Sequence, residues 1–137
     1  MKRYINGAIT YAALAMAGGV FYREFTKFNH FTGQTTLSVL HTHYFVLGMI
    51  FFLLLLLLEK NFAFSSAKSD KILLFYNIGL NTTVAMLFAR GITQVLNMPL
   101  SSGQDAAISG IAGLGHIILG VSIIYILLEI KKAVVKK

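Results

Sequence analysis

The chain has 137 residues, 56% of them hydrophobic and only 12% charged, with a mean hydropathy of +0.72, whereas soluble domains carry about 25% charged residues. It has no cysteine, which excludes disulfides, iron–sulfur clusters, thiolate metal sites and the covalent attachment of c-type haem. Its net charge of +7 comes from basic residues that flank apolar segments, so these residues indicate membrane topology and nucleic-acid binding is not expected.

Four apolar segments are long enough to cross a bilayer, for which a helix needs about 20 residues. They lie at about 4–22, 36–58, 72–96 and 106–129. They predict an all-α protein: a four-helix transmembrane bundle, up-down-up-down, that forms a single domain over residues 1–137.

The first segment has some features of a secretory signal peptide. Two basic residues, Lys2 and Arg3, precede an apolar stretch that contains small residues around Ala15, as signal peptides do. Because the chain still begins at Met1, we expect the segment to be kept as a span.

Basic residues are distributed unevenly between the two sides of the predicted bundle. Nine Lys and Arg residues fall on the side of the termini and of the second connection, against only Arg23 and Lys27 on the other side. The nine are Lys2, Arg3, Lys60, Lys68, Lys71, Lys131, Lys132, Lys136 and Lys137. The positive-inside rule therefore predicts that both termini are cytoplasmic.

The second segment carries two histidines, His41 and His43, inside an otherwise apolar run. Ionisable groups within a membrane are costly and usually functional. Residues two apart on a helix point about 200° from each other, so these two cannot chelate one ion from a regular helix. His41 shares its face with the small Gly48, so we expect His41 to face the bundle interior and His43 to face a neighbouring helix or a second protomer.

The third and fourth segments add Arg90 and His116. At 1.5 Å per residue, His41 and His43 lie about 8–11 Å, Arg90 about 9 Å and His116 about 15 Å below the outer ends of their helices. All four belong to the outer half of the bilayer. His116 shares its face with a stripe of small residues, which allow close helix packing or leave room for a flat ligand. The stripe is Ser109, Gly113 and Gly120.

Each of these residues also has a purely structural interpretation. The histidines can simply be hydrogen-bonded within the bundle. Arg90 can extend to the outer interface, or pair with a haem propionate, a lipid phosphate or Glu24. Asn77 and Asn81 on the third segment are more often interhelical hydrogen-bond partners than site residues.

Two stretches carry a resemblance to a known family. Residues 37–49, LSVLHTHYFVLGM, and 19–25, GVFYREF, resemble a family of small bacterial membrane proteins defined only as a domain of unknown function, DUF2871. The resemblance covers most of the chain and implies a multi-pass protein of the bacterial cytoplasmic membrane. It implies no activity.

A more distant resemblance concerns the histidines. The pattern His41-x-His43 followed by Leu47-Gly48, with Asn77 and Gly79 on the next span, is similar to short proteins related to subunit I of haem-copper oxidases. In those oxidases a histidine near the outer end of the second helix ligates the low-spin haem, so the resemblance implies that His41 or His43 is an axial ligand. The copper-site histidines are missing, and oxygen reduction is not implied.

The resulting hypothesis is a membrane protein that binds b-type haem for electron transfer, haem handling or gas sensing. His41 and His116 would ligate the iron, with His43 as a further candidate and Arg90 as the propionate partner. The alternatives are a small transporter or channel with a path lined by histidine and arginine, and a non-catalytic membrane subunit or assembly factor. We expect a homo-oligomer in the lipid bilayer, and not an enzyme.

Overall fold

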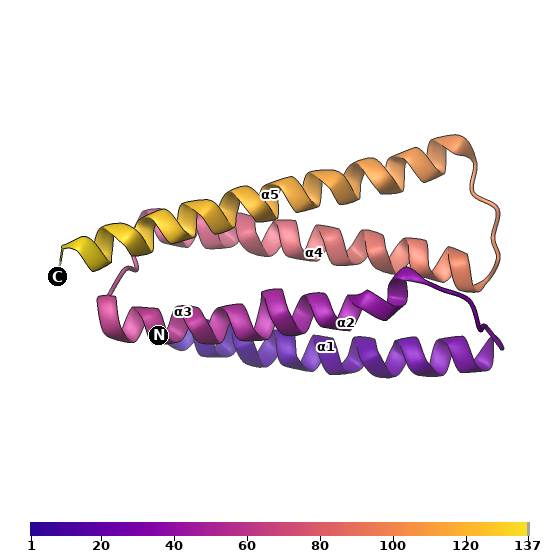
Figure 1. Ribbon diagram of the computed structural model, residues 1–137, viewed down its shortest axis with the longest axis horizontal. Helices are drawn as coiled ribbons and strands as arrows, with labels where there is room; N and C mark the ends of the chain where they lie inside the picture. Colours follow the sequence, from indigo (N-terminus) through magenta and orange to yellow (C-terminus); the bar gives the residue numbers. More distant parts are fainter. Residues whose placement is uncertain (137) are drawn as a thin grey trace.

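The computed structural model describes residues 1–136 as four antiparallel helical rods, with both termini at one end (Figure 1). The first, third and fourth rods are single helices, and the second combines four helical pieces. The elements are α1 (Lys2–Phe28), η1 (Thr36–Val39), α2 (Leu40–His43), η2 (Tyr44–Ile50), α3 (Phe51–Phe62), α4 (Ala67–Val95) and α5 (Ser102–Val135). Residue 137, which ends the predicted domain and the set of nine basic residues, lies outside the described residues.

Each rod contains a stretch long and apolar enough to cross a membrane, so the chain is a multi-pass helical membrane protein by length and composition. The helical fold class is confirmed, and residues 1–136 contain no strand. Every rod extends past the predicted span; α5, for example, runs to Val135 where the prediction ended at 129. The additional turns are polar or basic, and they extend the helices towards the water on either side. Which side is cytoplasmic stays a prediction.

Serine caps begin the last two long helices. The Ser66 side chain accepts a hydrogen bond from the Ser69 backbone N–H at the start of α4, and the Ser69 hydroxyl accepts from the Ser66 backbone N–H and donates to the Ser66 carbonyl. Ser101 and Gln104 form the equivalent capping box of α5. Such boxes satisfy backbone N–H groups that a helix start leaves without partners. The connections that lead into α4 and α5 therefore end at Ser66 and Ser101.

The second rod changes its helical winding along its length. It begins as a 3₁₀ turn, η1, passes through one α-turn, α2, and becomes a π-helix, η2, before α3 continues regularly. Hydrogen bonds from the η1 threonines to α4 hold its start: Thr35 Oγ1 donates to the Gly91 carbonyl at 3.1 Å and Thr36 Oγ1 to the Leu87 carbonyl at 2.7 Å. π-Helical segments are rare in proteins, and those that occur are often found at functional sites.

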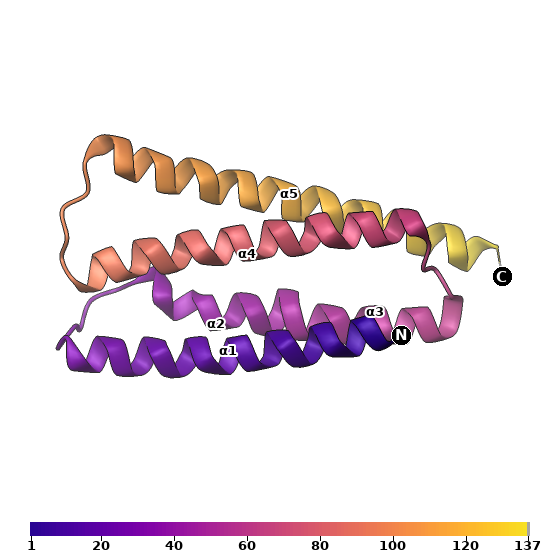
Figure 2. The ribbon, with the colours of Figure 1, turned by 180° about the vertical axis from the view of Figure 1, so that it is seen from behind.

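Close contacts between helices occur at glycines. A Cβ added at Gly79 of α4 would lie 2.6 Å from the Leu119 backbone nitrogen, and one added at Gly115 of α5 would lie 2.9 Å from the Thr83 nitrogen. Glycine is needed here because the two backbones touch. From this crossing α4 and α5 diverge towards the connection between them, as both views of the ribbon show (Figure 2).

Candidate functional site

Two histidines from different rods face each other. The imidazole rings of His43, at the end of α2, and His116, in the middle of α5, have centroids 6.3 Å apart and are nearly perpendicular at 81°. His43 is half-buried and His116 is exposed at the molecular surface. This is the one place in residues 1–136 where two histidine rings are recorded in contact.

Both rings are held in the same way by their own helices. Nδ1 of His43 lies 2.7 Å from the Val39 carbonyl oxygen, and Nδ1 of His116 lies 2.9 Å from the Ala112 carbonyl oxygen. A carbonyl oxygen can only accept a hydrogen bond, so in each neutral ring Nδ1 carries the hydrogen. The Nε2 atoms are then left with free lone pairs, and this is the arrangement that histidine ligands of metals use.

The glycine crossing of α4 and α5 positions His116. Gly115, the residue before His116, is buried against Thr83 of α4. The glycines of the small-residue stripe expected from the sequence do not pack against another helix. Cβ atoms added at Gly113 and Gly120 would have no atom within 4 Å. That stripe is therefore open to the surroundings, and the glycine that packs is Gly115, which the sequence analysis did not single out.

His41 has a different environment from His43. Its Cβ lies within about 4 Å of the positions that Cβ atoms on Gly18 and Gly19 of α1 would occupy, and its ring makes an edge contact with Phe45. Its Nδ1 atom is buried and has no hydrogen-bond partner. The predicted divergence of the two histidines is found, but the ring that α2 brings to His116 is that of His43. A ligand role for His41 stays a prediction.

Arg90 connects α4 with the outer turns of α5. Its Nη2 atom lies 2.9 Å from Asp105 Oδ1 and donates to Ser109 Oγ at 2.8 Å. Glu24, one of the partners considered for Arg90, instead lies 3.7 Å from Arg23. Asp105 was not among the partners expected for Arg90, although it stands in the first turn of a helix, where acidic residues are favoured. The propionate role of Arg90 stays a prediction.

A polar network crosses the bundle beside the histidines. Tyr11 of α1 donates to Asn77 Oδ1 at 2.5 Å, and Asn81 Nδ2 donates back to the Tyr11 hydroxyl at 3.0 Å. Tyr44, the residue after His43, donates to Asn81 Oδ1 at 2.9 Å. The expectation that Asn77 and Asn81 are interhelical hydrogen-bond partners is confirmed. Their tyrosine partners were missed, because one tyrosine in an apolar segment looks like ordinary core.

The histidine pair offers two nitrogen donors and no more. Among residues 1–136, no group of three or more His, Cys, Asp or Glu side chains is placed to hold a metal ion. A closed zinc-type site takes four protein ligands. Haem iron receives its equatorial ligands from the macrocycle and needs one or two axial donors from the protein. Of these two kinds of centre, two free Nε2 atoms fit the haem.

Comparison with known proteins places the chain in a family. A family model described as "Protein of unknown function (DUF2871)" matches residues 1–133. The chain belongs to this family. No curated protein and no solved structure matches it. The DUF2871 resemblance seen in the sequence is therefore shown, whereas no comparison supports the resemblance to haem-copper oxidases.

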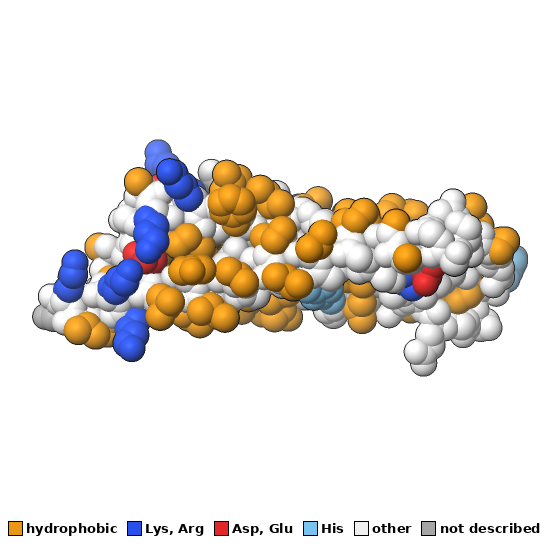
Figure 3. Space-filling view, turned by 90° about the horizontal axis from the view of Figure 1, so that it is seen from above, with side chains coloured by type: hydrophobic (Ala, Val, Ile, Leu, Met, Phe, Trp, Pro, Cys, Tyr) orange, Lys and Arg blue, Asp and Glu red, His pale blue; other side chains and the backbone are white. Residues whose placement is uncertain are grey.

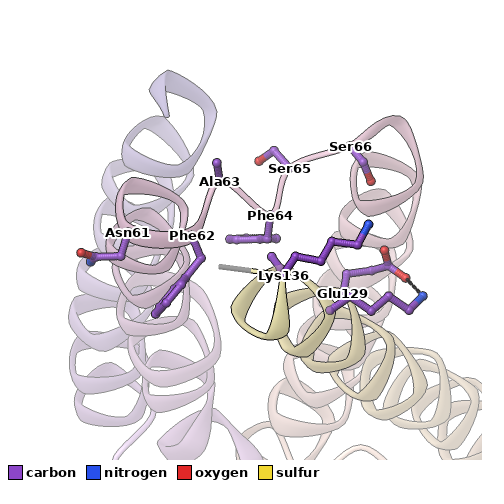
Figure 4. Close-up of a pocket in the computed structure, with 10 residues that line it drawn as sticks. Asn61, Phe62, Ala63, Phe64, Ser65, Ser66, Glu129 and Lys136 are labelled. Atoms are coloured by element: carbon purple, nitrogen blue, oxygen red, sulfur yellow. Dashed lines mark hydrogen bonds and ion pairs between the residues drawn. The ribbon is translucent and has the colours of Figure 1, made fainter.

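A second polar region lies at the end of the bundle that holds the termini. There a pocket of about 590 Å³ lies between residues 61–66 and the last turns of α5. In the close-up, Phe64 and Lys136 point into the space between the two segments, and Glu129 lies beside a lysine ammonium (Figure 4). This pocket is polar and lies at the opposite end of the bundle from the Arg90–Asp105 pair.

Proposed function

We propose that this protein is a b-type haem protein of the bacterial cytoplasmic membrane, with His43 and His116 as the two axial ligands. The observation that carries the proposal is the facing pair of imidazoles, each with Nδ1 bonded to a backbone carbonyl and Nε2 free. Haem iron with two histidine ligands is suited to electron transfer. The assignment replaces His41 by His43 in the pair expected from the sequence.

The surrounding residues have separate roles in this proposal. The Val39 and Ala112 carbonyls fix the orientation of the rings and their tautomer, with the hydrogen on Nδ1. The exposure of His116 leaves the site open to the bilayer, from which an apolar macrocycle can enter. Ser109, which binds Arg90, is seven residues before His116 and so about 10.5 Å further out along nearly the same face of α5. Arg90 is thereby a cation that could pair with an acidic group at the outer end of the site.

Absorption spectroscopy of the purified full-length protein tests the proposal. We expect a Soret band after expression with haem supply, and loss of the band in both His43→Ala and His116→Ala. The matched controls are His41→Ala, two residues from His43 but packed on α1, and His30→Ala in the first connection. Unchanged thermal unfolding would show that the variants remain folded.

Two results would overturn this assignment. A colourless protein that binds no added haem would leave the transport path and the partner-subunit role as the remaining candidates. A Soret band that persists in His43→Ala but disappears in His41→Ala would restore the original pair, His41 and His116.

The proposed topology has both termini in the cytoplasm, supported by the excess of Lys and Arg in the sequence around the termini and the second connection. Because the chain has no cysteine, single cysteines at Ser65 and Met98 give clean reporters. We expect a membrane-impermeant maleimide to label Met98→Cys in intact cells and to leave Ser65→Cys unlabelled. The reverse labelling would invert the topology. The expected homo-oligomer is tested by light scattering of the purified protein.

A further inference from the structure

An apolar groove follows α4 and α5 towards the end that holds the termini. The groove has a volume of about 510 Å³, and only Lys68 and Ser122 interrupt its apolar wall. Most of the wall is accessible from outside: Phe75 is 55% exposed and Ile117 is 63% exposed. The apolar lining residues are Ile72, Phe75, Ile117, Ile118, Val121 and Tyr125.

A charged cluster begins at Lys68, which lines the groove at the basic end, and continues with Glu129 and Lys132 on α5. The ammonium groups of Lys68 and Lys132 lie 3.0 and 2.9 Å from the same oxygen of Glu129, Oε1. The Glu129 side chain is 13% exposed, whereas both lysine side chains are about 60% exposed. One carboxylate cannot neutralise two ammonium groups. The cluster therefore keeps one accessible positive charge.

The groove and the cluster lie along one face of α5. Ser122, Tyr125, Glu129 and Lys132 follow each other at spacings of three and four residues, which places them on one side of a helix. The space-filling view shows the same division, with Lys and Arg gathered at one end and hydrophobic side chains along the length that follows (Figure 3). The surface is thus amphipathic along the direction in which a lipid lies.

We propose that this surface is a binding site for one anionic phospholipid of the leaflet at the basic end. An acyl chain fills the groove between α4 and α5, and the phosphate lies at the ammonium groups of Lys68 and Lys132. The uncompensated charge selects an anionic headgroup, because each basic residue near a membrane surface adds about 1 kcal/mol of attraction for anionic lipid. The apolar wall supplies the remaining binding, in proportion to the area it removes from water. This site is separate from the histidine pair and does not depend on haem.

Native mass spectrometry of the full chain tests the charge. Phosphatidylglycerol and phosphatidylcholine with identical acyl chains are compared at equal concentrations. We expect phosphatidylglycerol to be retained preferentially, and Lys68→Gln or Lys132→Gln to lower that preference about fivefold, the factor that about 1 kcal/mol represents. Lys60→Gln is the control, because Lys60 lies at the same end but outside the groove. Equal retention of the two lipids would overturn the proposal and indicate ordinary annular lipid.

A second variant tests the groove. Val121→Trp fills the lining, and we expect it to reduce retention of phosphatidylglycerol. Val20→Trp, at a position of α1 that is 63% exposed and outside the groove, is the matched control and should bind as the unmodified chain does. Wild-type retention in Val121→Trp would overturn the proposal. Displacement of the lipid by equimolar glycerol phosphate would do so too, because the cluster would then bind a soluble phosphate without the groove.

Discussion

The two ends of the bundle are held together differently. At the basic end, side chains bind side chains: Arg3 contacts Asp70 and donates to Ser65 Oγ at 2.6 Å, and the Tyr4 hydroxyl lies 2.9 Å from the same Ser65 oxygen. In the other half, His43 and His116 are bound to the backbone of their own helices. In that half, among residues 1–136, only the Arg90–Asp105 pair joins two rods by opposite charges.

The groups that stabilise the bundle therefore differ from the histidines, which keep a nitrogen available for binding. At the basic end Arg3, Tyr4, Ser65 and Asp70 satisfy one another, whereas the Lys68–Glu129–Lys132 cluster keeps one accessible positive charge. Each histidine donates one hydrogen bond to a backbone carbonyl, which orients the ring and leaves its other nitrogen free. A membrane protein can keep such free groups only if other contacts hold the rods, and the glycine crossing and the tyrosine–asparagine network supply those contacts. Four predictions test this division, from the largest expected effect to the smallest.

The glycine crossing should matter most. Gly115→Ala places a methyl group against the Thr83 backbone, and overpacking of this kind costs about 1–3 kcal/mol. Gly113→Ala, two residues away in open space, should be neutral or should stabilise the helix by up to about 1 kcal/mol. Thermal unfolding in detergent measures both. Equal effects of the two substitutions would mean that α4 and α5 do not cross at Gly115.

The tyrosine–asparagine network should come next. Asn81→Ala removes hydrogen bonds to Tyr11 and Tyr44 at once. Interhelical hydrogen bonds in membranes contribute about 0.6 kcal/mol on average, so we expect a loss of about 1 kcal/mol. Chemical unfolding measures this loss, with Asn29→Ala as control because Asn29 bonds only to its own helix. A loss no greater than that of the control would show that the tyrosine–asparagine network does not stabilise the fold.

The ion pairs at the two ends should each contribute less. Arg90→Gln breaks one pair whose side chains are 28% and 54% exposed, and Arg3→Gln breaks one whose side chains are 36% and 51% exposed. Exposed pairs contribute about 0–1 kcal/mol, and salt screens them. Each arginine also binds a serine, and we expect the larger loss for Arg3 because its guanidinium also lies over the Tyr4 ring, 4.8 Å from the ring centroid. Unfolding at low and high salt compares them, and a larger loss for Arg90 would contradict the proposed division.

The smallest effect should be a gain. Ala63 ends α3 with φ of 46° and ψ of 50°, a left-handed conformation that disfavours residues with a Cβ. Ala63→Gly should therefore raise stability by a few tenths to about 1 kcal/mol. Asn97, also left-handed at φ 50°, is a type of residue that tolerates this region, so Asn97→Gly is the control and should gain less. Differential scanning fluorimetry resolves the order, and destabilisation by Ala63→Gly would contradict it.

The fold class and the four spans were largely predictable, because the length of an apolar segment can be read from the sequence without knowledge of its contacts. The four spans were located correctly, although α5 is longer at both ends than predicted. The histidine pair was only half predicted. Counting depth from helix ends placed His116 in the same half of the bilayer as both histidines of the second span, but choosing between them required the path of that rod. The sequence carries no clear signal for its 3₁₀ and π segments.

Contacts that depend on two helices at once were also missed. Asp105 as the partner of Arg90 and Gly115 as the packed glycine follow from how α5 lies on α4. With several glycines on α5, periodicity alone selects no face. In contrast, Asn77 and Asn81 were interpreted correctly because an amide in an apolar span has few alternatives to binding a neighbouring helix.

The π-helix η2 sets the phase of the second rod. A π-turn accommodates extra chain within a helix, and each residue of an α-helix corresponds to a rotation of about 100°. Deleting one residue within Tyr44–Ile50 would rewind the segment and rotate the turn that carries His43 relative to α3, with every side chain in that turn unchanged. The number of residues in η2 thus determines whether the His43 imidazole faces α5 or the lipid. Insertions and deletions here should be more damaging than most substitutions.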